Sequence, residues 1–384
     1  MPETITANFA GIDPLSAVTH PDPYPYYREL AATRPFFREQ GLGLWVAAGP
    51  REVAAVLAHP DCRVRPATQP VPPALAGTAA GDLFGQLIRM NDGAAHAPLK
   101  ALLMPMLAAV DPDVAAQRVA AMAQVLDAGE RAHIAVPAAS VNRWLFALPV
   151  VTVASVLGLP VARDRGAADE VAQQVAAFAA AQSPLADADT VRAGAGAARW
   201  LGTWLASSLA SSVAADGPLP ALQRAARAAD IEAQAVAANI IGLLVQACEA
   251  TAGLAGSTLL WLGRNPSAGG MPLQGVVTRV AQDDPPVQNT RRFLAADTEL
   301  CGHAVKAGDT VLALLAAAST SGLADDARAW TFGHGRHACP GGRLAQALAA
   351  ATVSALCARG AEPAALARAF RYRPSLNARI PHFL

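Results

Sequence analysis

Apolar residues recur at three- and four-residue steps through most of the chain, a pattern typical of amphipathic helices. The clearest such segments, all rich in Ala, Leu, Arg and Gln, are residues 113–129, 189–213 and 231–262. Strand patterns are few: residues 44–47 stand before Gly49-Pro50, and residues 298–305 are joined through Ala307-Gly308 to residues 310–315 as in a hairpin. The sequence therefore predicts a mainly α-helical protein with a small β-sheet component.

Glycine and proline are spread along the chain without a period, 30 and 29 residues respectively, so repeat architectures are excluded. No Ser-rich, Gly-rich or charged linker divides the sequence. The Pro-rich residues 66–75 are too short for a domain linker and are interpreted as a loop between helices. We therefore predict a single domain over residues 1–384.

One apolar stretch, residues 240–262, is long enough to cross a bilayer, but it carries Gln246, Glu249 and Thr251 near its middle. Because a carboxylate is costly in lipid, a buried helix is the better interpretation and we expect no membrane association. The N-terminus shows no basic region followed by an apolar core, so no secretory signal is predicted. Five widely spaced cysteines favour reduced thiols and a cytoplasmic protein.

The charge balance argues against nucleic-acid binding. The chain carries 30 basic and 30 acidic side chains and has a formal net charge of zero, whereas binding to a phosphate backbone needs an excess of Lys and Arg. With 53% hydrophobic and 16% charged residues, intrinsic disorder is also excluded.

The most informative segment is residues 332–342, FGHGRHACPGG, where a glycine-rich loop ends in Cys339 before a predicted helix. Helix N-termini stabilise thiolates, and Gly335 and Gly341 leave room for a flat or bulky neighbour, so Cys339 is suited to bind a metal. Three alternatives are an inert core thiol, a zinc fragment with His334 and His337, and a phosphate cradle. A zinc site needs a fourth ligand, and the glycine spacings of phosphate loops are absent.

The spacing Phe332-x-x-Gly335-x-x-x-Cys339-x-Gly341 resembles the haem-binding loop of the cytochrome P450 family. The resemblance implies haem b with the Cys339 thiolate as the axial ligand of its iron, and Phe332 and Gly341 as further haem-binding residues. It also implies the family's fold, in which the haem is buried between the long central helix and the helix that follows the cysteine loop. Residues 22–27, 43–46, 148–160, 284–292 and 372–377 resemble segments of the soluble bacterial members.

By the same resemblance, the haem propionates would be held by His96, Lys100, Arg291 and His337. Buried carboxylates need cationic and hydrogen-bonding partners, so these residue types suit that role.

The central helix departs from the family's pattern, in which an acid and then a threonine guide protons for dioxygen activation. Glu249 holds the acid position, but Ala250 replaces the alcohol and the hydroxyl is displaced to Thr251, about 100° further round the helix. Glu249 and Thr251 are the candidate catalytic residues. A substrate hydroxyl with ordered water, or another route, would replace the missing alcohol, and Thr251 alternatively packs with its hydroxyl bonded to a carbonyl one turn back.

A second departure affects the family's Glu-x-x-Arg pair, whose positions hold Arg279 and Gln282. The loop that carries its third partner is reduced to residues 323–330. Loss of all three members is self-consistent, because one member kept alone would leave an uncompensated buried charge.

The resemblance implies a monomeric monooxygenase that inserts one oxygen atom of O₂ into a small, mainly apolar substrate of natural-product type that could carry a hydroxyl. Electrons would come from a separate ferredoxin-type partner, because no flavin or nicotinamide fingerprint is present. Gln246, Ala247, Val287 and residues 65–90 would form the pocket wall, and Arg336 and Arg343 are either docking residues or solvated arginines. The alternatives are a peroxide-dependent or redox-neutral haem-thiolate enzyme that catalyses a rearrangement or dehydration, and a catalytically silent haem-binding helper.

Overall fold

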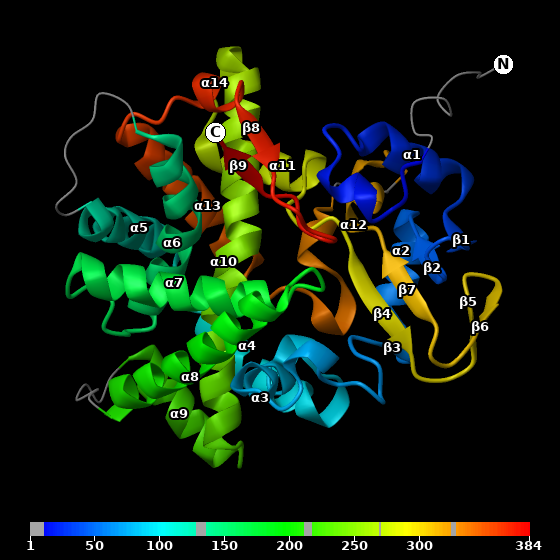
Figure 1. Cartoon of the computed structure of the whole chain (residues 1–384), viewed down its shortest axis with the longest axis horizontal. Helices are drawn as coiled ribbons and strands as arrows, with labels where there is room; N and C mark the ends of the chain where they lie inside the picture. The colour runs from blue at the N-terminus through cyan, green and yellow to red at the C-terminus, as the bar shows by residue number, and fades with distance from the viewer. Residues whose placement is uncertain (1–10, 128–135, 211–216, 269, 324–327) are drawn as a thin grey trace. The chain divides into compact units, whose positions relative to one another are not determined.

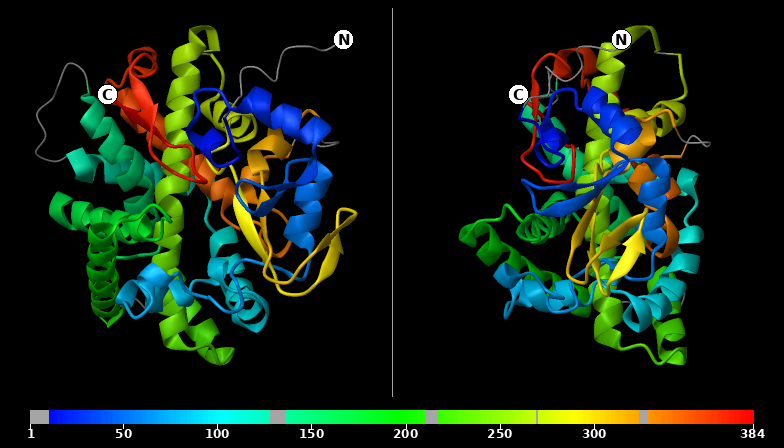
Figure 2. Two further views of the ribbon diagram at one scale, coloured as in Figure 1. Left: turned by 45° about the vertical axis from the view of Figure 1, so that its right-hand side comes forward. Right: turned by 90° about the vertical axis from the view of Figure 1, so that its right-hand side faces the viewer.

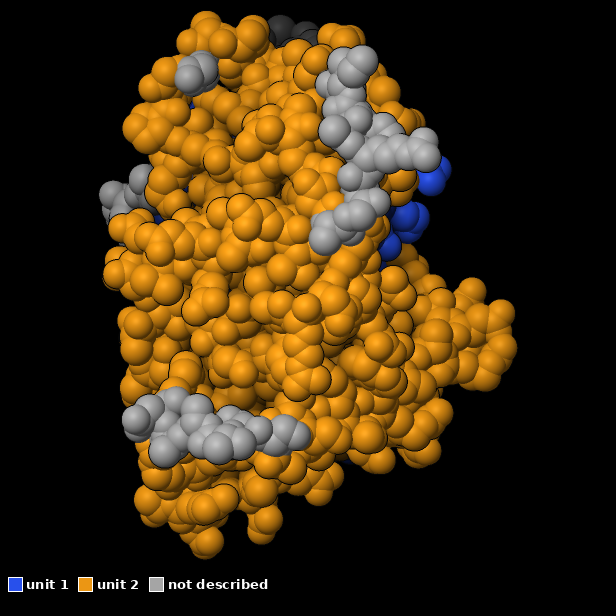
Figure 3. Space-filling view, turned by 90° about the vertical axis from the view of Figure 1, so that its left-hand side faces the viewer, with its two compact units in different colours: residues 1–68, 278–339, 371–381 blue, residues 69–277, 340–370, 382–384 orange. Residues whose placement is uncertain are grey.

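The structure is a computed structural model that describes residues 11–127, 136–210, 217–268, 270–323 and 328–384. Two compact units share the chain. Unit 1 comprises Met1–Thr68, Thr278–Cys339 and Arg371–Pro381, and unit 2 comprises Gln69–Val277, Pro340–Phe370 and His382–Leu384 (Figure 3). The Pro-rich residues 66–75 are a loop only in part, because Pro73–Leu75 form a 3-10 turn. The segment follows strand β3 rather than a helix and contains the first passage from unit 1 to unit 2. The prediction of one domain over residues 1–384 remains a prediction.

Unit 1 is built on a five-stranded sheet with the order β1-β2-β7-β4-β3 (Figure 1). Its strands are β1 (Phe36–Glu39), β2 (Leu44–Ala47), β7 (Thr310–Ala313), β4 (Thr290–Leu294) and β3 (Cys62–Arg63). β2 and β7 pair in parallel and every other neighbouring pair is antiparallel. The predicted strand at residues 44–47 is confirmed.

β2 is buried on both faces because helices cover both sides of the sheet. Trp45 and Ala47 belong to the core cluster that includes Val53 of α2 (Pro50–Ala58). Leu44 and Val46, one residue out of phase, belong to the cluster of α1 (Tyr24–Thr33). The period of two in a strand thus divides four consecutive apolar residues between two cores.

The predicted pairing of residues 298–305 with residues 310–315 is wrong. Residues 298–305 fold back on themselves as the hairpin of β5 (Thr298–Leu300) and β6 (His303–Val305), whereas β7 joins the main sheet. The hairpin turn consists of Cys301 and Gly302 with φ of 51° and 76°, a left-handed pair that matches the twist of a two-residue turn. β7 ends at Ala313, and α12 (Leu315–Thr320) follows it.

Unit 2 is helical, and α10 (Ala233–Arg264) runs through it as one unbroken helix in both views of Figure 2. It packs against α6 (Ala138–Val156), α7 (Arg165–Ala181), α8 (Ala188–Ala210) and α13 (Gly342–Ala358). The other helices of the unit are α3 (Ala79–Gly85), α4 (Ala97–Ala108), α5 (Pro112–Asp127), α9 (Pro218–Ala228) and α14 (Pro363–Leu366). The three predicted helices correspond to α5, α8 and α10, although residues 128–129 and 211–213 lie outside the described residues.

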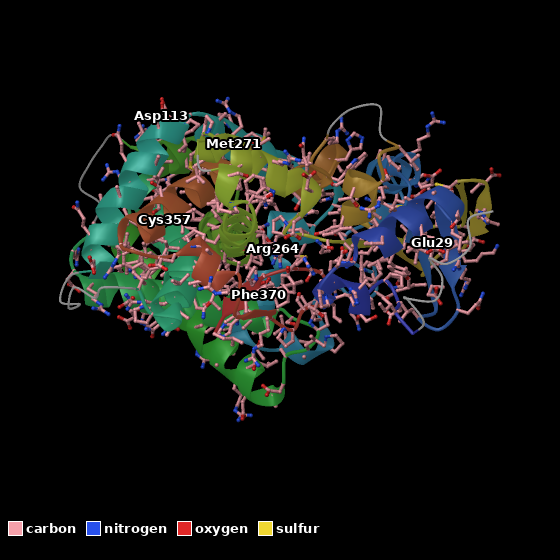
Figure 4. All side chains as sticks on the ribbon, turned by 90° about the horizontal axis from the view of Figure 1, so that it is seen from above. Glu29, Asp113, Arg264, Met271, Cys357 and Phe370 are labelled. Carbon is pink, nitrogen blue, oxygen red and sulfur yellow. The ribbon has the colours of Figure 1, made fainter. Side chains whose placement is uncertain are left out.

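Small side chains let α10 approach its neighbours closely. A Cβ on Gly263 would lie 2.2 Å from the carbonyl oxygen of Pro363 in α14, so only glycine fits there. One residue further on, the Arg264 guanidinium lies 5.4 Å from the ring centroid of Phe370 (Figure 4). A cation in the last turn of a helix also suits the helix dipole.

The chain is completed by α11 (Leu273–Asp283) and by a two-stranded sheet of β8 (Phe370–Tyr372) and β9 (Pro381–Phe383). By length and composition alone, two helices of the described part, α6 and α10, could cross a membrane. If a bent pair of helices is counted as one further span, the number rises to three. About two thirds of the most apolar window of α10, 67%, is buried inside the fold.

Candidate functional site

The cysteine loop of unit 1 is shaped by left-handed glycines. Two short 3-10 turns, Trp330–Phe332 and Gly335–His337, are separated by Gly333 with φ of 70°, and Gly335 itself has φ of 66°. A Cβ on Gly335 would lie 3.2 Å from the carbonyl oxygen of Leu57, so the expected close approach at Gly335 is made by backbone of α2. The Cys339 N–H then donates to the Phe332 carbonyl over 2.7 Å, which closes the loop on itself.

Arg336 fixes this loop to the segment that leaves α2. Its guanidinium donates to the carbonyl oxygens of His59 at 2.9 Å and Cys62 at 2.7 Å, and to those of Ala58 and Pro60 at longer range. Arg336 is therefore a structural residue, neither a solvated arginine nor a free docking cation. Arg343, in the first turn of α13, is exposed.

The thiol of Cys339 is exposed at the end of this anchored loop. The next helix, α13, begins at Gly342 with Gly341 as its N-cap, so Cys339 precedes the helix rather than opening it. Gly341 has an ordinary φ of −96°, and a Cβ there would meet no protein atom within 4 Å. No protein contact therefore requires glycine at 341, whereas a flat group lying on the backbone would.

Arg291 is a half-buried cation on β4 of the same unit. Within the described residues, no carboxylate or hydrogen-bond acceptor contacts its guanidinium, and burial lowers its pKa. A guanidinium that is partly desolvated and lacks an anion suits an anionic ligand. Phe332 and His337 are also half-buried.

Unit 2 holds the other two predicted propionate partners on one face of α4. His96, the N-cap, is 6% exposed, and its carbonyl oxygen accepts the N–H of Lys100 over 2.9 Å. A separation of four residues places their side chains one turn apart on one face of the helix.

The structure does not bring the two candidate catalytic residues together. On α10, Glu249 and Gln246 are exposed, whereas Thr251 is 2% exposed and packed in the core. Two residues correspond to about 200° of rotation in an α-helix, so the Glu249 and Thr251 side chains leave the helix on opposite sides. Ala250, at the position of the missing alcohol, is half-buried.

The positions of the lost Glu-x-x-Arg pair lie on α11. Arg279 is exposed there and pairs over 3.1 Å with Asp283, one turn along the same helix, so its charge stays in solvent. The shortened loop predicted at residues 323–330 is described only in part, because residues 324–327 lie outside the described residues. Arg328 donates to Nδ1 of His334 at 2.8 Å.

Sequence reasoning missed two arginines, the buried Arg379 in unit 1 and the half-buried Arg89 in unit 2. Arg379 is 1% exposed and binds Asp284 and backbone carbonyls near the N-terminus. Arg89 lies within the segment predicted as a pocket wall, but nothing in the sequence marks Gln182 as its partner. Both depend on partners far away in the chain, which local pattern cannot reveal.

The residues present fit a haem. In unit 1, Cys339 offers an exposed thiol that can ligate a metal, and within the described residues Arg291 has no anion beside it. The zinc alternative is less well supported, because no three His, Cys, Asp or Glu side chains of the described residues gather as a metal site.

No model of a known protein family and no curated protein matches the chain. Solved structures do match it over nearly its whole length. One is P450BioI, solved in complex with hexadec-9Z-enoic acid ligated acyl carrier protein. Its TM-score is 0.75 at 20% identity, and the match covers 94% of this chain and 99% of the P450BioI chain. Epothilone D-bound cytochrome P450epoK has a TM-score of 0.76 at 18% identity and covers 97% and 98%. The Tepidiphilus thermophilus P450 heme domain has a TM-score of 0.74 at 17% identity and covers 98% and 97%. The expected fold is therefore confirmed: the chain has the cytochrome P450 fold.

Proposed function

We propose that this chain, which has the fold of the bacterial cytochromes P450, is a haem-thiolate monooxygenase with Cys339 as the axial ligand. The observation that carries the proposal is the exposed Cys339 thiol at the end of a loop fixed by backbone hydrogen bonds and by Arg336. An exposed thiol held in one place by its loop is suited to bind the metal of a group that the chain itself does not supply.

Haem b, when bound, supplies the activation of dioxygen, which its thiolate ligand assists by donating electron density. The chain's own residues bind and orient the cofactor. Cys339 donates the thiolate, Phe332 shields the sulfur from water, and Gly341 leaves the backbone open to a flat neighbour. Arg291 and His337 of unit 1, with His96 and Lys100 of unit 2, are the proposed partners of the propionates.

Glu249 is the proposed proton-relay acid. Its carboxylate is exposed on a helix whose adjacent residues Ala247 and Cys248 are buried, so it can exchange protons with ordered water. Thr251 is buried on the other side of α10, which favours a role in packing. A hydroxyl of the substrate would then replace the alcohol missing at Ala250.

The proposed substrate is a small, mainly apolar molecule, and the proposed electron donor is a separate ferredoxin-type protein. The solved structures of similar fold include one with a fatty acid on an acyl carrier protein and one with epothilone D, which supports a fatty-acid or natural-product substrate. A cytoplasmic monomer is part of the same proposal.

A second candidate function is favoured by Ala250 and by the position of Thr251. An enzyme that takes peroxide, or that catalyses a redox-neutral rearrangement or dehydration, has less need of a proton relay for dioxygen. Turnover with peroxide but not with reduced ferredoxin would favour this candidate.

Haem titration of matched cysteine variants tests the proposal. Cys339→Ser should lose the thiolate-type Soret spectrum and bind haem at least about tenfold more weakly, which corresponds to about 1.4 kcal/mol. Cys357→Ser, which alters another exposed cysteine on α13, is the control and should titrate like the wild type. Equal spectra and equal affinity for the two variants would contradict the assignment of Cys339.

A further inference from the structure

Arg89 is a half-buried cation of unit 2, and within the described residues no carboxylate forms an ion pair with it. It lies in the 3-10 turn Ile88–Met90, and within the described residues its single hydrogen-bond partner is a neutral amide, the Oε1 of Gln182. Its Nε atom is buried with no partner. A guanidinium has five N–H donors, and leaving them unpaired inside a protein is costly. Within the described residues, the chain therefore provides no charged acceptor for the Arg89 guanidinium.

The turn that carries Arg89 is fixed to α10. Asn239, which is 3% exposed, accepts the Ile88 N–H over 2.8 Å and donates to the carbonyl oxygen of Gln86 over 2.8 Å. Asn91 closes the turn from its other end by donating to the carbonyl oxygens of Gly85 and Leu87, each at 2.8 Å. The position of Arg89 is thus set before any ligand arrives, which reduces the entropic cost of binding.

The amide of Gln182 is fixed as well. It is the C-cap of α7, and its Nε2 donates to the carbonyl oxygen of Phe178 over 3.3 Å, so its Oε1 is directed to the guanidinium. Phe178 and Leu87 are 0% and 1% exposed, so the elements that hold the guanidinium are themselves part of an apolar core. An acceptor placed at Arg89 would therefore be partly removed from water.

Glu249 is an acidic residue of α10 whose charge acts on Arg89. Burial lowers the pKa of Arg89 to about 10 and the charge of Glu249 acts in the opposite direction, so Arg89 is protonated at neutral pH. The two side chains are not within 4 Å of each other in an ion pair, and Glu249 is exposed on α10. Because Glu249 would repel a doubly charged ligand more strongly, a monoanion suits the site better than a phosphate dianion.

We propose that Arg89, oriented by Gln182, binds the carboxylate group of a small, largely apolar molecule. The inference rests on the proposed function insofar as that molecule is the substrate, and it specifies the substrate class. A guanidinium and a carboxylate can form two parallel N–H···O bonds, a geometry that a neutral amide such as Gln182 does not offer. The apolar surroundings of the turn suit the remainder of the molecule.

Calorimetric titration with two carboxylates and their neutral esters tests the inference on the haem-loaded protein. The probes are decanoate and para-methoxybenzoate, each compared with its methyl ester. At least one acid should bind the wild type about ten- to a hundredfold more tightly than its ester, and Arg89→Met should abolish that preference while ester binding stays within about twofold. Arg192→Met, on exposed surface of α8 beside Asp189, is the control and should keep the preference.

Two further variants separate a binding role from a structural one. Glu249→Gln removes a nearby negative charge and should tighten carboxylate binding severalfold without changing ester binding. Gln182→Leu keeps the Arg89 charge but frees its orientation, so it should weaken carboxylate binding and leave ester binding unaltered. Circular dichroism and thermal melting of each variant identify those that fail to fold.

The inference is overturned if neither acid binds the wild type more tightly than its ester, or if Arg89→Met weakens acid and ester equally. The second result would make Arg89 a structural residue or a counter-ion of Glu249. Calorimetry detects the carboxylate whether or not the protein turns it over, and the haem spectrum is recorded separately. Failure of the inference is thereby distinguished from failure of the proposed function.

Discussion

The guanidinium of Arg379, 1% exposed, donates from Nε to the carboxylate of Asp284 over 2.9 Å. Its Nη1 atom donates to the carbonyl oxygens of Val18 and His20, and the hydroxyl of Tyr24 donates to the same carboxylate. This ion pair connects the N-terminal segment, the loop after α11 and the C-terminal segment of unit 1. In the same unit Arg279 forms an exposed pair with Asp283, so the residues at the lost Glu-x-x-Arg positions do not form this buried ion pair.

We expect Arg379→Met to lower the free energy of unfolding by about 3–5 kcal/mol, because it leaves Asp284 without its cation. The matched control is Arg279→Met, which breaks a pair whose side chains are 58% and 57% exposed and should cost less than about 1 kcal/mol. Urea unfolding of both variants measures the difference. Equal losses would mean that the buried pair contributes no more than a surface pair.

Stability should also fall at alkaline pH. Burial raises the pKa of the Cys62 thiol to about 11, against 9.0 for a free thiol, and burial likewise raises the pKa of Cys301 to about 11. Because the unfolded chain loses these protons first, the full contribution is present below pH 9.0 and is lost as pH rises towards about 11. Urea unfolding across this range should show the decline, and Cys62→Ala should reduce its slope. An unchanged slope would contradict the burial of this thiol.

Arg291→Met should weaken haem binding about tenfold or more, since a charge-assisted hydrogen bond contributes about 1.5–3 kcal/mol. The rate of haem transfer to apomyoglobin measures the loss. Arg371→Met, which changes an exposed arginine of β8, should transfer haem at the wild-type rate. If both variants lose haem equally fast, Arg291 is not a propionate partner.

Glu249→Gln should lower ferredoxin-supported turnover about a hundredfold and leave the haem spectrum unchanged, because it removes a proton donor rather than a ligand. Ala250→Thr, which restores the missing alcohol, should raise the fraction of electrons that reach product. Product formed per electron consumed measures both effects. Full activity of Glu249→Gln would assign the relay to another group.

The sequence predicts the elements whose residues determine them locally. Period and propensity are sufficient for α5, α8 and α10, and the short apolar run before Gly49-Pro50 correctly predicts β2. The hairpin at residues 298–305 was missed because its turn needs a left-handed φ at Cys301, a residue that rarely adopts one.

The sequence likewise predicts only those parts of the candidate site that depend on local residues. The motif around Cys339 is local and could be read, and the exposed thiol agrees with it. The roles of Arg336, Arg379 and Arg89 depend on carbonyl, carboxylate and amide partners from distant segments, so no spacing reveals them. Glu249 and Thr251 are two residues apart and leave the helix on opposite sides, and the structure adds that Glu249 is exposed and Thr251 buried.

The central claim is that the Cys339 thiolate is the axial ligand of a haem. The most direct test is the absorption spectrum of the purified protein, first oxidised and then reduced under carbon monoxide. The account predicts a Soret band of the ferrous carbonyl form shifted far to the red, the signature of thiolate ligation. Absence of haem, or a carbonyl band at the shorter wavelength of neutral-thiol or imidazole ligation, would contradict it.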